Sequence, residues 1–218
     1  MILTKKECNQ LFITLLAASI ASSLLQTALA TALPSIMRDL DISATTAQWL
    51  TSAYSLAMGI MIPATAFLMK RFPMRKLFLG AVFLFAIGTA VILLSNNFMF
   101  LLLGRLLQAL GNGIILSATQ VVILTVFPKK KQGTVMGIYG LSVGAAPVIA
   151  PTLSGIIIDI WNWKTIFLIT LIIVFADILL SLKTMKNVTK TEMVTFDLSS
   201  MLLCTIGFKR KIICWLLL

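Results

Sequence analysis

Two charged residues that could do chemistry lie inside long apolar stretches of the sequence, Arg105 and Asp177. Arg105 is the only charged residue between Leu77 and Phe127, and Gln108 follows it three positions later on the same helical face. A charge inside such a stretch is costly to bury, and residues of this kind usually face a cavity, a partner or a proton path. Both residues are therefore candidates for binding protons or polar groups.

The composition indicates that these side chains belong to a membrane protein. Of 218 residues, 59% are hydrophobic and 11% are charged, whereas a soluble domain has about 45–50% apolar and about 25% charged residues. The chain has no histidine, and Cys8 lies far from Cys204 and Cys214. This argues against a metal- or triad-based hydrolase and against a disulfide scaffold. The net charge of +11 lies in short clusters without a continuous basic face, which argues against nucleic-acid binding.

Six segments are long and apolar enough to cross a bilayer as helices, which takes about 20 residues each. The first is expected to stop near Pro34, and a polar break at Ser95–Asn97 separates the third from the fourth. The predicted spans are 11–32, 46–68, 76–95, 98–124, 132–158 and 164–182. Nothing alternates with a period of two, so we expect an all-α integral membrane protein.

The loops between these spans alternate in positive charge. Every second loop is basic, and the basic set contains Lys5, Lys6, Lys70, Arg71, Arg75, Lys76, Lys129, Lys130, Lys131, Lys183, Lys186 and Lys190. The other loops hold only Arg38 and Lys164. Cytoplasmic loops are enriched in Lys and Arg, so the N-terminus of this multi-pass cell-membrane protein is predicted to be cytoplasmic. Trp49, Trp161 and Trp163 then fall at the outer interface, where indole rings prefer to lie.

Arg105 and Asp177 each have a structural alternative in this topology. Arg105 lies about eight residues into its span, so it either faces a cavity with Gln108 or extends to the outer surface. Asp177 either reaches water at the cytoplasmic end of the sixth span or binds a proton. Gly111 and Gly113, which follow Arg105, permit close approach of a neighbouring helix.

The fifth span contains two prolines, Pro147 and Pro151, among small residues that include Gly144 and Gly155. Each proline frees a backbone carbonyl and bends the helix. Small residues also permit tight packing. The span is therefore predicted to be a kinked packing helix, a hinge between two states, or both.

The last part of the sequence differs from the six-span unit at 1–182. Residues 183–196 are mostly polar and are predicted to form a cytoplasmic loop. The apolar run that follows, from Leu198 to Phe208, is too short to cross a bilayer. Three cations at 209–211 would be costly at that depth. We expect an incomplete seventh helix with an atypical basic tail at 197–218.

Four stretches, in this order, carry a resemblance to a known family. They are 25–37 at the end of the first span, 68–77 after the second, 105–111 in the fourth and 147–155 in the fifth. Together they resemble the N-terminal half of a major facilitator superfamily transporter. The similarity is to the drug:proton antiporter branch with about fourteen spans, the EmrB/QacA type, whose members consist of repeated halves. It covers about residues 10–208.

The resemblance implies roles for single residues, because in such carriers two six-helix halves rock about a central site. It implies a substrate and proton pathway of Gln26, Arg105 and Gln108, a hinge of Gly144, Pro147, Pro151 and Gly155, and a cytoplasmic gating loop of Arg71, Arg75 and Lys76. Gln26 stands where the family often has an acid, and Lys70 and Pro73 replace the acid and glycine usual in the loop. For this loop, ordinary positive-inside charge remains the alternative.

The function implied is proton-coupled efflux of drugs or other amphiphilic small molecules, with the proton gradient as energy source, no cofactor and no enzymatic activity. A pump needs a second six-helix half, from a separate chain or a homodimer, because one half has no opposing wall. The length of the sequence leaves two further expectations open. In the first, the chain is an inactive truncated product of a frameshifted or split gene, which inserts into the membrane but does not transport alone. In the second, it is one subunit of a two-chain pump.

Overall fold

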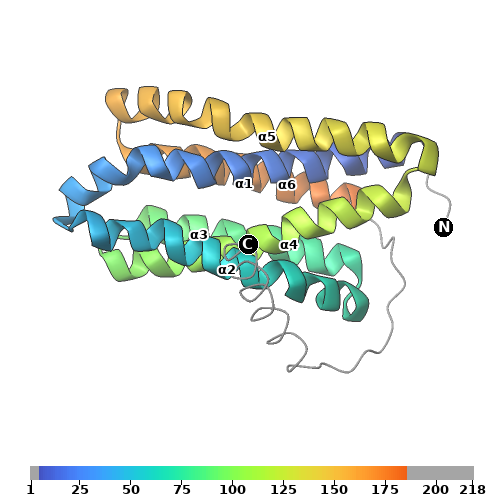
Figure 1. Cartoon of the computed structure of the whole chain (residues 1–218), viewed down its shortest axis with the longest axis horizontal. Coiled ribbons are helices and arrows are strands. Elements are labelled where there is room, and N and C mark those ends of the chain that lie inside the picture. Colours follow the sequence, from blue (N-terminus) through green and yellow to red (C-terminus); the bar gives the residue numbers. More distant parts are fainter. Residues whose placement is uncertain (1–4, 186–218) are drawn as a thin grey trace, which may run out of the picture.

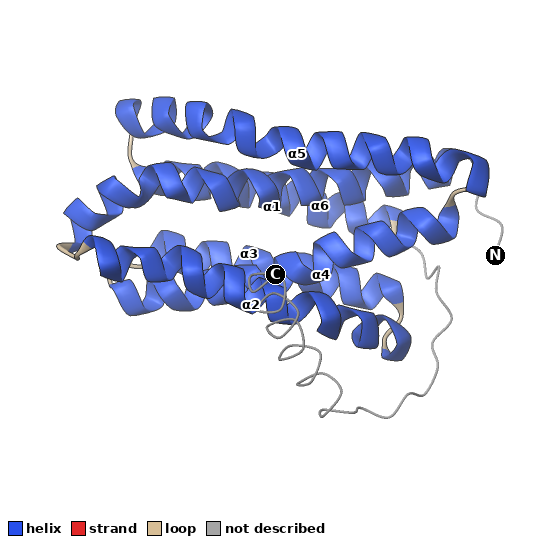
Figure 2. Cartoon of the chain, in the orientation of Figure 1, coloured by secondary structure: helices blue, strands red, loops and turns tan. Residues whose placement is uncertain are grey.

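The computed structural model describes residues 5–185, and this part of the chain is a bundle of six helices joined by short turns, without strands (Figure 2). The helices are α1 (Lys5–Leu40), α2 (Ala44–Arg71), α3 (Met74–Leu94), α4 (Phe98–Val126), α5 (Lys129–Ile160) and α6 (Trp163–Thr184). Each is long and apolar enough to cross a membrane. The predicted all-α class is therefore confirmed. The expected seventh helix at 197–218, and most of the loop at 183–196, lie outside the described residues.

The first helix is longer than predicted, because α1 continues past Pro34 to Leu40. Pro34 is exposed, and the loss of one backbone hydrogen bond at such a position does not stop a helix that its neighbours hold in place. Asp41 then ends α1 with a φ of 50°, a conformation that aspartate tolerates better than most residues. Ser43 begins the next helix, since its hydroxyl accepts a hydrogen bond from the amide of Thr46 at 3.2 Å.

The turns at the two ends of the bundle are built differently. At one end, Asn97 and Asn162 cap α4 and α6 by accepting backbone N–H bonds at 3.1 and 3.2 Å. At the other end, Pro73 and Pro128 stand directly before α3 and α5, where the missing N–H costs nothing. The lysines and arginines at 70–76 and 129–131 lie at this second end, which we call the basic end.

The helices pack as two groups, with α1, α5 and α6 on one side and α2, α3 and α4 on the other (Figure 1). Glycines allow α4 to approach its neighbours closely. A Cβ built on Gly88 would lie 2.6 Å from the Gly104 carbonyl oxygen, and one on Gly111 would lie 2.6 Å from that of Ala81. Gly113 makes the equivalent approach to α2. The predicted close packing at Gly111 and Gly113 is therefore present.

Two helices, α2 and α5, are the least covered of the six described helices. Within the most apolar window, 22% of α2 and 17% of α5 is buried, against 56% for both α1 and α4. In Figure 1, α5 lies at the edge of the bundle and contacts mainly α1. The described bundle therefore leaves long faces of α2 and α5 open.

Candidate functional site

Arg105 is buried where α4 meets α2 and α3, with only 1% of its surface exposed. Its Nη1 donates a hydrogen bond of 3.0 Å to Oε1 of Gln108, one turn along α4. The guanidinium carbon lies 4.0 Å from the centre of the Tyr54 ring on α2, in cation–π geometry. The alternative in which Arg105 extends to the membrane surface is therefore wrong, and its charge is held inside the protein.

Gln108 continues the hydrogen bonding from α4 to α3. Its Nε2 donates to the hydroxyl of Thr89 at 2.8 Å, and that hydroxyl donates to the carbonyl of Phe85 at 2.8 Å. Thr89 was not among the predicted site residues. The signal that could have found it is that Thr89 is the only polar side chain between Leu77 and Leu94.

Asn112 connects the same face of α4 to α2. Its Nδ2 donates to the phenolic oxygen of Tyr54 at 2.7 Å, and Tyr54 is 1% exposed. Asn112 lies seven residues after Arg105, a spacing that returns to the same helical face. That spacing was a usable sequence signal, whereas nothing in the sequence shows that Tyr54 lies opposite. We call these residues the Arg105 cluster: Tyr54, Thr89, Arg105, Gln108 and Asn112.

Two atoms of the Arg105 cluster are left without a hydrogen-bond partner among the described residues. They are the Nε donor of Arg105 and the Oδ1 acceptor of Asn112, both fully buried. An unmet buried polar group costs about 1–3 kcal/mol. The cluster therefore offers one donor and one acceptor, next to a fixed positive charge, for a further polar group.

Gln26 does not belong to this cluster. It lies on α1, partly exposed, and no hydrogen bond between described residues joins it to Arg105 or Gln108. The structure thus brings together two of the three predicted pathway residues and leaves the third on another helix.

The predicted hinge residues lie on the open side of α5. Pro147 and Pro151 are exposed, and α5 continues through both of them as one helix. A Cβ placed on Gly144 or Gly155 would meet nothing within 4 Å in the described chain. These glycines therefore do not serve packing inside this bundle, and their space is free for another surface.

The predicted gating residues lie at the basic end, where Arg71, Arg75 and Lys76 are exposed. Arg75 bridges two helices, because its Nη2 donates to the carbonyl of Leu182 at 2.9 Å. This contact ties the start of α3 to the last turns of α6.

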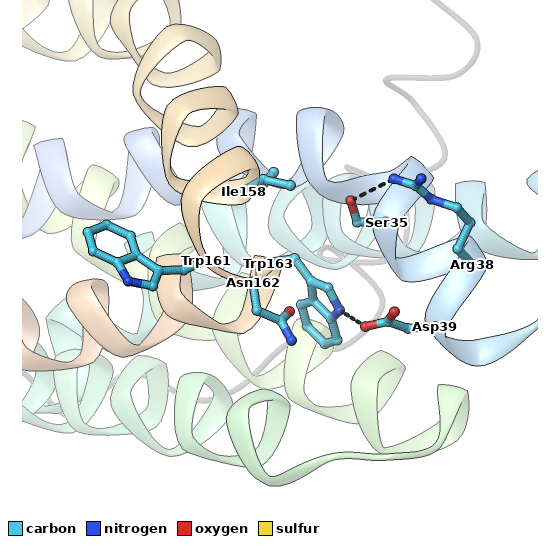
Figure 3. A pocket seen from close by; sticks show the side chains of 7 residues that line it. All are labelled: Ser35, Arg38, Asp39, Ile158, Trp161, Asn162 and Trp163. Atoms are coloured by element: carbon cyan, nitrogen blue, oxygen red, sulfur yellow. Dashed lines mark hydrogen bonds between the residues drawn. The ribbon is translucent and has the colours of Figure 1, made fainter.

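The opposite end of the bundle holds a pocket of about 200 Å³, lined by Ser35, Arg38, Asp39, Ile158, Trp161, Asn162 and Trp163 (Figure 3). Trp163 Nε1 donates to Oδ2 of Asp39 at 2.6 Å, which ties α6 to α1. Trp163 is 2% exposed, unlike Trp49 and Trp161 at 58% and 66%. Trp163 is therefore covered by the protein at this end of the bundle, and its N–H bonds the exposed carboxylate of Asp39. That these rings lie at the outer membrane interface stays a prediction.

Lys164 also anchors the start of α6 at this end through hydrogen bonds. Its Nζ donates to the carbonyl of Ser95 and to Oδ1 of Asn96, both at 2.9 Å. The start of α6 is thus held by α1 on one side and by the α3–α4 turn on the other. The pocket shares no residue with the Arg105 cluster, and its polar groups hold helices together.

Comparison with known sequences identifies the family. The sequence profile of the Major Facilitator Superfamily matches residues 15–208. The chain belongs to the Major Facilitator Superfamily. This match confirms the family membership that the motifs predicted. Proteins of this superfamily carry small molecules across membranes and are not enzymes, which agrees with the predicted membrane location.

Among relatives in the superfamily, the MFS-type transporter YcnB of Bacillus subtilis is 44% identical over 194 residues, covering 89% of this chain and 41% of YcnB. The lincomycin resistance protein LmrB of B. subtilis is 38% identical, covering 91% and 41%. The multidrug export protein EmrB of Escherichia coli is 31% identical, covering 92% and 40%. The chain therefore spans less than half the length of these relatives.

Solved structures of the superfamily share the fold. A peptide transporter POT structure superposes with a TM-score of 0.75 at 13% identity, covering 94% of this chain and 45% of that one. A bacterial homologue of the lysosomal transporter Spinster gives 0.68 at 19% identity, covering 90% and 47%. In both, the six helices correspond to less than half of a facilitator fold.

Proposed function

We propose that the chain forms the N-terminal half of an exporter that removes drugs or other amphiphilic small molecules in exchange for protons. The substrate class is supported by two relatives whose names state lincomycin resistance and multidrug export. The observation that carries the proposal is the Arg105 cluster, a buried cation beside polar atoms that no described residue satisfies. A half of this kind needs such groups where substrate or protons pass.

In this proposal Arg105 and Gln108 are polar groups of the substrate and proton pathway, and Gln26 contributes from α1. Arg105 supplies a fixed positive charge to this pathway. Gly144, Pro147, Pro151 and Gly155 form the hinge on α5, while Arg71, Arg75 and Lys76 form the cytoplasmic gate. The bridge from Arg75 to the Leu182 carbonyl supports the gate, because it would have to break for α3 and α6 to separate.

The second half docks on α2 and α5 in this proposal. These two helices are the least covered in the described bundle, and Gly144 and Gly155 face open space. The partner is either a further six-helix segment, supplied by the same or a separate chain, or a second copy of this half. Without it the central pathway has only one wall, so this half alone is expected not to transport.

The test is dye efflux from cells that contain either this chain alone or this chain together with the second half of YcnB, its 44% identical relative. The chain alone is expected to give no efflux. The combination is expected to give efflux that a protonophore stops. Efflux that survives the protonophore would contradict proton coupling, and no efflux where complete YcnB is active would contradict the transport role. Transport by the chain alone would contradict the need for a second half.

We also propose that the basic end faces the cytoplasm, because it carries the lysine- and arginine-rich turns. In a cysteine-free background, Asn96→Cys should react with a membrane-impermeant thiol reagent added to intact cells. Lys130→Cys should react only after the cells are opened. Asn96 is exposed in the α3–α4 turn and Lys130 is exposed in the first turn of α5. The reagent's access to the two positions is therefore expected to differ only by the side of the membrane on which each lies. The reverse labelling pattern would invert the topology.

A further inference from the structure

Asp177 lies on the face of α6 that is turned into the bundle. The buried residues of α6 recur at helical spacing: Trp163, Ile166, Phe167, Thr170, Val174, Asp177 and Ser181. Ile172, Phe175 and Leu179, on the remaining surface, are exposed. Asp177 itself is 2% exposed. The alternative in which it reaches water at the end of the span is therefore wrong.

The carboxyl group of Asp177 has no partner in the described chain. Neither of its two oxygens has a hydrogen bond, and both are fully buried. One turn further along α6, the hydroxyl of Ser181 is also buried and without a partner. Side chains four residues apart on a helix are neighbours, so the carboxyl and the hydroxyl lie within reach of each other.

No described cation donates a hydrogen bond to this carboxyl group. The helices packed against α6 are α1, α3 and α5. The titratable or charged residues with described side chains on these helices and on α6 itself are Glu7, Cys8, Arg38, Asp39, Arg75, Lys76, Lys129, Lys130, Lys131, Tyr139, Asp159, Lys164 and Lys183. None of them bonds Asp177. Arg75 is placed nearby, but its Nη2 bonds the Leu182 carbonyl, five residues or about 7.5 Å further along α6.

We propose that Asp177 is a reversible proton-binding site, occupied in this packing: the carboxylate takes up one proton and becomes a neutral carboxylic acid. An ionised carboxylate that is fully buried, with no cation bonded to it and a single hydroxyl as its one possible donor, is far more costly to bury than the neutral acid. The neutral acid keeps its proton and can donate a hydrogen bond from its O–H to the Ser181 hydroxyl oxygen, which gives the carboxyl group and the hydroxyl a partner. The site lies between α6 and its neighbours, apart from the Arg105 cluster of α2, α3 and α4.

The consequence for transport rests on the proposed function, although the protonation of Asp177 does not. Gln26 cannot carry a proton, and Asp177 is the only acid in the interior of a described helix that is buried. It is therefore the carboxyl group in this half that is placed to take up and release the coupled proton. Ionisation would leave a bare charge between α6 and its neighbours, which favours their separation.

The test is infrared spectroscopy of the full 218-residue chain in an ester-free detergent, because the ester carbonyls of lipids absorb in the same region. At about pH 7 exposed carboxyl groups are ionised, so a neutral carboxylic-acid carbonyl band reports a buried, protonated acid. The wild type is expected to show this band and to shift it in D₂O. Asp177→Asn should abolish it. The matched control is Asp41→Asn, at an exposed turn position with a φ of 50° that asparagine also adopts readily; it should keep the band.

Two outcomes would overturn the proposal: no band in the wild type, or a band that persists in Asp177→Asn. If Asp177→Asn does not insert, Asp177→Glu replaces it and must move the band to a new frequency, while Asp41→Glu must not. An unmoved band in Asp177→Glu overturns the site equally. The band is measured without transport, so its absence refutes this site, whereas absent dye efflux refutes the proposed function.

Discussion

Replacing Arg105 with alanine in the two-half transporter is expected to lower the initial rate of dye efflux about ten- to a hundredfold. The substitution removes the donor to Gln108 and the cation over the Tyr54 ring. A buried hydrogen bond from a charged group is worth about 1.5–3 kcal/mol, and about 1.4 kcal/mol corresponds to a factor of ten in rate. Efflux rate is normalised to the amount of inserted protein, measured by immunoblot of washed membranes.

Two further variants separate the role of Arg105 from general damage. Arg105→Lys keeps the charge but lacks the planar fork that bonds Gln108 while lying over Tyr54, so it should also lose efflux. Arg38→Ala, which replaces an exposed arginine in the last turn of α1, outside the Arg105 cluster, should export at the wild-type rate. Undiminished efflux by Arg105→Ala would remove Arg105 from the pathway.

Replacing Gly88 with alanine is expected to destabilise the bundle by about 1–3 kcal/mol, the usual cost of forcing extra atoms into a packed interface. The added Cβ would lie 2.6 Å from the Gly104 carbonyl oxygen and 2.8 Å from the Gln108 amide nitrogen. Both are backbone atoms of α4, so α3 and α4 must move apart. In a thermal unfolding curve of the detergent-solubilised chain, this corresponds to a loss of about 2–10 °C in Tm.

The matched control lies on the same helix. Gly80 is exposed on α3, and a Cβ there would meet nothing within 4 Å. Gly80→Ala should therefore keep Tm or raise it slightly, because alanine favours helix by up to about 1 kcal/mol over glycine. Equal Tm values for Gly88→Ala and Gly80→Ala would show that the α3–α4 contact is looser than the geometry requires.

The Arg105 cluster illustrates where sequence patterns stop being informative. Arg105, Gln108 and Asn112 share one face of a single helix, and the helical repeat alone places them together. Their partners come from other helices, with Thr89 bonding Gln108 from 19 residues away and Tyr54 bonding Asn112 from 58. No local rule predicts such pairs, since they depend on how each helix is rotated against the next.

The sequence also leaves open whether a polar residue faces the interior of the bundle or its surface. For Arg105 and Asp177 the sequence allowed both an inward and an outward position, because a residue near a helix end can reach either the interior or the membrane surface. The structure buries both, at 1% and 2% exposure. Trp163 is likewise buried, at 2% exposure, and the sequence does not show that its N–H bonds the carboxylate of Asp39.

The sequence by itself determined the six helices, their approximate ends and their family, because a bilayer admits backbone only as long, internally bonded apolar segments interrupted by polar turns. It could not determine that α1 runs on past Pro34 to Leu40, nor which side chains meet inside the bundle. Only the tertiary structure decided those points. Glycine contacts set the distances and rotations between helices, and these rotations determine which buried polar groups find a partner and which, like the carboxyl group of Asp177, do not.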